Sequence, residues 1–84
     1  MKLIFGEQSW SDYLYWQSAD KRTLKKINAL LQDIKRNPFD GIGKPESLKH
    51  EMAGTWSRRI NQEHRLVYEV VEESILVVSC RYHY

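Results

Sequence analysis

The chain has 84 residues with 13 basic and 11 acidic side chains, so a formal net charge of +2 gives no argument by itself for nucleic-acid binding. A hydrophobic content of 42% suffices for a compact core in one domain over residues 1–84 but excludes a deep internal ligand cavity, so a site should be an open groove. The single Cys80 excludes an internal disulfide, and no segment approaches membrane-spanning length or resembles a signal peptide. We therefore expect a cytoplasmic domain with no membrane contact.

The first part of the chain predicts a strand followed by two helices. Residues 2–5 are a short apolar run, most simply a strand. Residues 9–18 predict a helix with an aromatic stripe, which we interpret as core or subunit contact, with a base-stacking platform as the alternative. A second helix is expected over residues 21–36, with Asp20 as its N-cap and Pro38 just beyond its end.

The second predicted helix has a basic outer face besides its apolar stripe. The basic residues of its first two turns are Lys21, Arg22, Lys25 and Lys26. Two interpretations stay open: a solvated face that favours solubility, or a patch for backbone phosphates.

The segment after this helix has weaker patterns. Residues 39–46 predict a loop, and its Gly41 and Gly43 do not form a nucleotide-binding fingerprint because no third glycine and no helix follow them. Residues 47–52 predict a weak strand with Leu48 turned inward.

The last third of the chain predicts three consecutive antiparallel strands. They cover residues 56–60, 64–71 and 75–84, which are rich in β-branched and aromatic residues and are separated by short polar breaks. We expect Arg59 to pair with Arg65, and Val71 with Ile75.

This register separates the apolar residues from the basic ones, because side chains alternate between the two faces of a strand. The face expected in the core has Leu66, Tyr68, Val70, Leu76, Val78 and Cys80. The other face has Arg59, Arg65, Arg81 and His83. Such a face is often merely solvated. Like charges directly opposite each other are destabilising, however, so the pattern also suits a site that binds an anion.

The chemical groups available suit cleavage of a phosphodiester bond. The chain combines a carboxylate, several cations and an imidazole, namely Glu46, Lys49, Arg59, Arg65, Arg81 and His83. In RNA the 2′-hydroxyl can attack the adjacent phosphorus, provided that a base, an acid and donors to the phosphate oxygens are present. The histidines lack metal-ligand spacing and Cys80 is expected to be buried, so we predict no metal and no other cofactor. By composition, this chemistry is one hypothesis among several.

Several motifs along the chain are specific enough to compare with a known family. They are found at residues 13–16, 37–39, 43–46, 56–60, 64–68 and 82–84. The closing Tyr-His-Tyr, together with Trp-Ser-Arg-Arg-Ile at residues 56–60, resembles the YoeB toxins of the RelE/ParE superfamily, which belong to type II toxin–antitoxin systems. The resemblance extends over the whole chain.

The resemblance implies a RelE-like α+β fold with an N-terminal strand, two helices and an antiparallel sheet of C-terminal strands, the helices packed on one face. It implies a ribosome-dependent mRNA endonuclease that cuts in the ribosomal A site and inhibits translation. The implied partners are the ribosome and mRNA, a YefM-type antitoxin, a second copy in a homodimer, and operator DNA only through the antitoxin complex.

The resemblance also implies roles for individual residues. Glu46 is the expected general base on the 2′-hydroxyl, His83 the general acid for the leaving oxygen, and Arg65 the ligand of the scissile phosphate. The residues expected to position the RNA are Lys49, Arg59 and Tyr84. For Arg81 no role is implied, and it stays a candidate for either phosphate contact or structure.

Two other hypotheses remain open. One is a catalytically weak module that binds antitoxin and acts as a corepressor. The other is an interaction domain whose aromatic stripe, with Trp10 and Trp16, is the functional surface.

Overall fold

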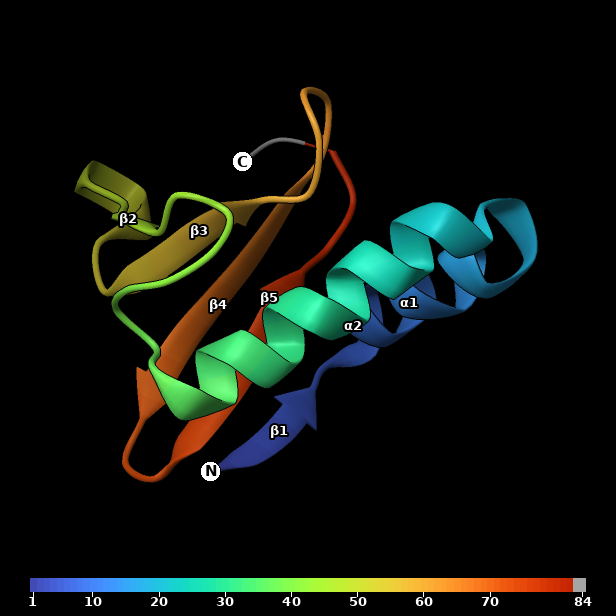
Figure 1. Cartoon of the computed structure of the whole chain (residues 1–84). Helices are drawn as coiled ribbons and strands as arrows, with labels where there is room; N and C mark the ends of the chain where they lie inside the picture. Colours follow the sequence, from blue (N-terminus) through green and yellow to red (C-terminus); the bar gives the residue numbers. More distant parts are fainter. Residues whose placement is uncertain (83–84) are drawn as a thin grey trace.

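The computed structural model describes residues 1–82, and its elements follow the predicted order of a strand, two helices and a group of strands (Figure 1). In chain order they are β1 (Lys2–Phe5), α1 (Glu7–Ala19), α2 (Lys21–Arg36), β2 (Glu46–Ser47), the short 3-10 helix η1 (His50–Met52), β3 (Thr55–Arg59), β4 (Arg65–Val71) and β5 (Ser74–Ser79). In this part of the chain, no helix has both the length and the apolar character needed to cross a membrane.

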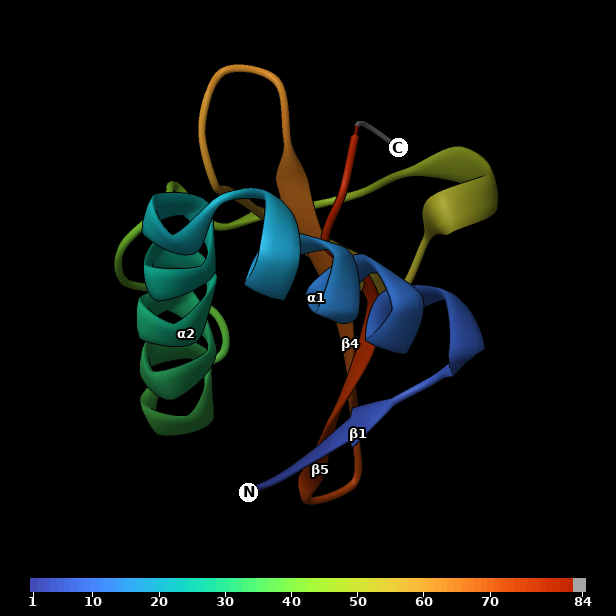
Figure 2. The same cartoon turned by 90° about the vertical axis from the view of Figure 1, so that its right-hand side faces the viewer.

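The strands form one sheet in the order β1-β5-β4-β3-β2. β1 pairs parallel with β5, whereas the other neighbours pair antiparallel. A parallel pair needs a long crossover connection, and α1 and α2 provide it. Both helices lie on the same face of the sheet, as Figures 1 and 2 show. The predicted α+β arrangement with helices on one face is confirmed.

The second helix begins where its cap predicts. The Asp20 carboxylate accepts hydrogen bonds from the backbone N–H groups of Arg22 at 3.0 Å and Thr23 at 3.2 Å. These N–H groups have no partner within the helix, so the cap satisfies them. The buried face of α2 packs on the sheet through Ile27 and Leu30, both fully buried.

The first helix does not bury the stripe that its sequence suggests. Its buried residues are Ser9, Asp12 and Trp16. Trp10 is 48% exposed and Leu14 44% exposed, so these two residues of the stripe are not in the core, and for them subunit contact and base stacking remain the open interpretations.

The β4–β5 hairpin differs from the predicted register by one residue. Val71 pairs with Ser74, not with Ile75, because only two residues form the turn. The first of them, Glu72, adopts a left-handed conformation with φ of 57°, which suits a tight hairpin. Ser74 therefore belongs to the strand and not to the turn.

This shift changes which side chains of β5 enter the core. Ile75 and Val77 are buried, whereas the predicted Leu76 and Val78 are only partly buried. The register is interrupted again opposite Val67 and Tyr68, and the extra residue of this bulge reverses the alternation. Cys80 is consequently buried as predicted.

The last strand is shorter than predicted and ends at Ser79. At Cys80 the backbone N–H donates to the Asp12 carboxylate at 3.0 Å, and the carbonyl accepts from the Trp16 indole N–H at 2.8 Å. Side chains of α1 thus provide the hydrogen bonds to the Cys80 backbone that a neighbouring strand would otherwise provide. The predicted strand residues His83 and Tyr84 lie outside the described part of the chain.

Candidate active site

The strand register brings three predicted site residues to one face of the sheet. Glu46 in β2 pairs with Ser57, and Arg59 pairs with Arg65 as predicted. Ser57 and Arg59 are two residues apart on β3, so their side chains share a face. Trp56 and Arg58 alternate with them and point to the helices. Glu46, Arg59 and Arg65 therefore occupy the face of the sheet that the helices leave uncovered.

A cationic hollow lies beside these arginines. It has a volume of about 670 Å³ and is open to solvent. Its cationic lining residues are Lys26, Lys44, Arg59 and Arg65, and no acidic residue of the described part of the chain lines it. Lys44 is not among the predicted site residues, and the sequence pattern leaves the role of the basic face of α2 open. The hollow shows that α2 adds one lysine, Lys26, to the positive charge around Arg59 and Arg65.

The guanidinium of Arg65 is oriented by the loop that precedes it. One terminal nitrogen donates to the carbonyl of Asn61 at 2.7 Å and to that of His64 at 3.1 Å. The remaining N–H groups of this guanidinium have no acceptor within residues 1–82. A guanidinium binds two phosphate oxygens side by side through such a pair of donors, so Arg65 is held by one edge and can bind an anion with the other.

Glu46 reaches the sheet through a loop that is bound to β3. The Arg59 N–H donates to the Gly43 carbonyl at 2.7 Å, three residues before Glu46. Gly43 has φ of 81°, and a Cβ there would lie 2.7 Å from a Leu30 methyl group. Glycine is therefore required both by conformation and by space. Only Lys44 and Pro45 separate this fixed point from Glu46, which limits how far the carboxylate can move.

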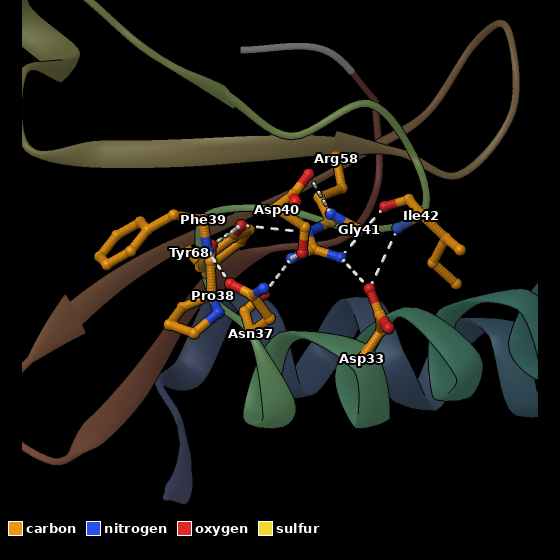
Figure 3. Close-up of polar contacts among 9 residues, drawn as sticks. All are labelled: Asp33, Asn37, Pro38, Phe39, Asp40, Gly41, Ile42, Arg58 and Tyr68. Carbon is orange, nitrogen blue, oxygen red and sulfur yellow. Dashed lines mark hydrogen bonds and ion pairs between the residues drawn. The ribbon is translucent and has the colours of Figure 1, made fainter.

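A buried arginine holds the rest of the same loop (Figure 3). Arg58 is fully buried, and each of its N–H groups has an acceptor. The acceptors are the Tyr68 hydroxyl at 3.1 Å, the Asp33 carboxylate at 2.6 Å, and the carbonyls of Ile42 at 3.1 Å, Asn37 at 2.6 Å and Asp40 at 3.0 Å. A buried charge is tolerable when its hydrogen-bonding capacity is filled in this way. Arg58 thus joins α2, the loop and β4 at one point.

Two neighbours complete this arrangement. The Tyr68 hydroxyl donates to the Pro38 carbonyl at 2.6 Å, and burial raises the pKa of this hydroxyl. The Asp33 carboxylate accepts from both Arg58 and the Ile42 N–H. A Cβ at Gly41 would overlap that carboxylate, so the loop also needs glycine there. The loop that leads to Glu46 is therefore held along most of its length.

Acidification is expected to destabilise the protein partly through Asp33. The hydrogen bond from Arg58 is the main cause that holds the pKa of Asp33 below its ordinary value of 3.8. The carboxylate therefore contributes stability above that pH and loses the contribution as the pH falls below 3.8. The variant Asp33→Asn should melt at a lower temperature than the wild type at neutral pH, and the gap should narrow in acid. Melting followed by circular dichroism between about pH 7 and pH 2 checks this.

Asp20 makes a second contribution to the acid sensitivity of the protein. The pKa of Asp20 is also lowered, mainly by the Thr23 hydroxyl, so the protein loses the stability that this carboxylate contributes in the same acidic range. The Asp33→Asn variant should therefore keep part of the acid sensitivity. A gap between the two melting curves that stays constant with pH would contradict the role given to Asp33.

The other predicted site residues fall in different places. Lys49 is exposed and directly precedes η1. Arg81 does not join Arg59 and Arg65 in the cationic hollow. Its guanidinium lies 3.5 Å from the ring centroid of Tyr15 in α1 and 4.6 Å from that of Tyr82. His83 and Tyr84 lie outside the described residues, so their predicted roles stay predictions.

Cys80 is unsuited to nucleophilic chemistry, in line with its expected burial. It is fully buried, and burial is the main cause that raises the pKa of its thiol to about 12. The nearby Asp12 carboxylate acts in the same direction. At neutral pH the thiol is protonated and a poor nucleophile.

Two residues that hold the site, Arg58 and His64, are not among the predicted site residues. The alternation that placed Arg59 on the open face also put Arg58 among the core residues, and an arginine at a core position is a signal of a buried polar network. His64 begins a predicted strand and the motif at residues 64–68, but neither pattern predicts a role for its side chain. It is buried, and its Nδ1 accepts from the Tyr82 N–H at 2.7 Å, a contact between distant residues that has no local sequence signal.

Comparison with known proteins gives matches along the full chain. The family described as "YoeB-like toxin of bacterial type II toxin-antitoxin system" matches residues 5–84. The Toxin YoeB of Escherichia coli K12 is 63% identical over 84 residues, which cover 100% of both chains. The Toxin YoeB of a Synechocystis species is 58% identical and covers 100% of this chain and 98% of the relative.

Solved structures agree with this match. A YoeB/ParE toxin from Agrobacterium tumefaciens superposes with a TM-score of 0.98 at 52% identity, covering 100% of both chains. The YoeB dimer from Staphylococcus aureus has a TM-score of 0.92 at 52% identity, with 100% of this chain and 98% of that one covered. A YoeB–YefM heterotetramer from the same organism gives the same values. The RelBE2 complex of Mycobacterium tuberculosis, at 21% identity and a TM-score of 0.71 over 98% of this chain and 96% of that one, shares the RelE-like fold.

Proposed function

Since the chain belongs to the YoeB-like toxins of bacterial type II toxin–antitoxin systems, we propose that it is an endoribonuclease that cuts mRNA in the A site of the ribosome and so inhibits translation. The observation that supports this most directly is the shared face of Glu46, Arg59 and Arg65. One carboxylate and two guanidiniums on an open, cationic surface suit a substrate that is a nucleic-acid backbone.

The proposed reaction uses the 2′-hydroxyl of the RNA as the nucleophile. Glu46 takes the proton from this hydroxyl, and the oxygen attacks the adjacent phosphorus. The bond to the 5′-oxygen breaks, and His83 donates a proton to that leaving oxygen. The products are a 2′,3′-cyclic phosphate and a free 5′-hydroxyl, so the step needs neither a metal nor a redox partner. DNA is spared because it lacks the 2′-hydroxyl.

The cations supply charge stabilisation and position the RNA. Arg65 holds the scissile phosphate and stabilises the charge that grows on its oxygens in the transition state. Arg59, directly opposite Arg65, binds the adjoining backbone together with Lys49 and Tyr84. The hollow beside Arg59 and Arg65 supports this assignment, since its four cations extend the positive surface beyond the reacting phosphate. Arg81, whose guanidinium lies over the rings of Tyr15 and Tyr82, stays a candidate for either phosphate contact or structure.

The proposed partners follow from the relatives. The Staphylococcus aureus protein was solved both as a dimer and in a complex with YefM. We expect this chain likewise to form a homodimer, to be neutralised in the cytoplasm by a YefM-type antitoxin, and to reach operator DNA only through that complex.

Toeprinting on a translating ribosome tests the proposal. Purified protein is added to ribosomes stalled at a defined codon, and primer extension maps new 3′ ends of the mRNA. We expect a cut inside the A-site codon that is absent when the same mRNA is incubated without ribosomes. If a folded protein that still binds its antitoxin produces no cut, the chain is a catalytically weak antitoxin-binding module instead.

A further inference from the structure

The chain after β5 is held mainly by side chains, together with one backbone hydrogen bond from the Arg65 N–H to the Tyr82 carbonyl. The Cys80 backbone is bound to Asp12 and Trp16 of α1, as described above. The next contact involves Arg81, whose guanidinium stacks on the rings of Tyr15 and Tyr82. These contacts bring the end of the described chain beside the loop between β3 and β4, which Figure 1 shows in orange next to the red trace.

At Tyr82 both backbone polar groups are bound. Its N–H donates to Nδ1 of His64 at 2.7 Å, and its carbonyl accepts from the Arg65 N–H at 3.0 Å. Tyr82 has φ of 65°, a left-handed conformation that is uncommon for a residue with a side chain. Residues keep such conformations when their surroundings hold them there, and these residues are often found at functional sites.

His64 is itself fixed in one orientation and one tautomer. The ring is buried and packs edge-on against Trp16, with 4.8 Å between the ring centroids. Because a backbone N–H always donates, Nδ1 must be the acceptor, and the proton of the neutral ring is on Nε2. Nε2 lies 3.6 Å from the Glu63 carboxylate, which favours that tautomer.

We infer that His64 is a positioning residue for the reaction: by binding the Tyr82 N–H, it fixes the backbone of the residue that directly precedes His83 in the sequence. This inference rests on the proposed function, in which His83 is the general acid. Arg65, the proposed phosphate ligand, binds the other backbone polar group of Tyr82, because its N–H donates to the Tyr82 carbonyl. Tyr82, which His64 binds, thus also contacts Arg65 and is followed in the sequence by His83, the proposed general acid. The placement of His83 matters because a general acid acts only within hydrogen-bond reach of the leaving oxygen.

Two substitutions separate the hydrogen bond from the packing. His64→Phe keeps a ring against Trp16 but removes the acceptor. His64→Asn loses the ring but places a carbonyl oxygen near the position of Nδ1. We expect the Phe variant to cleave at least about tenfold more slowly in single turnover with saturating ribosome complexes, with affinity for those complexes unchanged. The Asn variant should recover most of the rate.

A measurement independent of activity is hydrogen exchange of the Tyr82 amide by NMR. The amide should be protected in the wild type, exposed in His64→Phe and protected again in His64→Asn. Melting temperatures of the three proteins show whether a rate loss follows general destabilisation.

The outcomes are distinct. Wild-type rates or an equally protected Tyr82 amide in His64→Phe would overturn the inference, as would equal rate losses in both variants that follow their melting temperatures. If the wild type itself cleaves nothing, the proposed function fails. The exchange data alone then decide: protection lost in Phe and regained in Asn keeps His64 as the residue that fixes Tyr82, and unchanged protection overturns that role.

Discussion

Replacing Glu46 by alanine is expected to lower the single-turnover rate of ribosome-dependent mRNA cleavage by about 10²-fold or more, while the fold is retained. The reason is that the variant loses the base that takes the proton from the 2′-hydroxyl. Glu46 lies in a two-residue strand on the open face of the sheet, so its side chain adds nothing to the core. The measurement is the rate of appearance of the new mRNA 3′ end after mixing excess protein with stalled ribosomes.

A matched control is Glu73→Ala. Glu73 is an exposed carboxylate in the β4–β5 turn. Its replacement by alanine therefore changes the net charge as much as Glu46→Ala does, but it leaves the proposed site unchanged. It should cleave like the wild type. The variant His83→Ala should resemble Glu46→Ala, because both groups move a proton in the same step. Wild-type rates in both Glu46→Ala and His83→Ala would refute their assignment as base and acid.

The arginine pair of the site was predictable because local rules determine it. Alternation along β3 and β4 and the polar break between them fix Arg59 opposite Arg65, and the structure confirms this pair. Glu46 could not be placed in this way. Its strand has two residues, too few for an alternating pattern, and only the pairing with Ser57 puts it on the same face. The role of Glu46 was predicted from the resemblance to a known family, because the strand periodicity gave no information about this residue.

The path of the chain end was not predictable for a different reason. The bulge opposite Val67 and Tyr68 lies in an apolar run without glycine or proline, so nothing in the sequence marks it. The end of β5 at Ser79 depends on Asp12 and Trp16, which are far away in the sequence. The periodicity of apolar residues predicts single helices and strands. It therefore does not predict contacts between side chains that are far apart in the sequence.

Replacing Arg58 by methionine is expected to lower the free energy of unfolding by about 3 kcal/mol or more. Methionine fills much of the space of the aliphatic stem but donates no hydrogen bond. The carbonyls of Asn37, Asp40 and Ile42 and the Tyr68 hydroxyl would lose their shared donor. Because partly buried acceptors that lose their donor are costly, the loop should detach from β3. The midpoint of urea unfolding measures the loss, at a slope of about 1 kcal/mol per molar urea for a small domain.

The adjacent residue provides the control, since Arg59→Met removes the same charge from an exposed position on the same strand. Its stability should change by no more than about 0.5 kcal/mol, although RNA cleavage should weaken. The two variants therefore separate stability from substrate binding. Arg58→Lys keeps a charge but has three donors in place of five, so its unfolding midpoint should lie between those of Arg58→Met and the wild type. Equal midpoints for Arg58→Met and Arg59→Met would mean that the loop before Glu46 is held by its glycines and its packing, and not by the buried guanidinium.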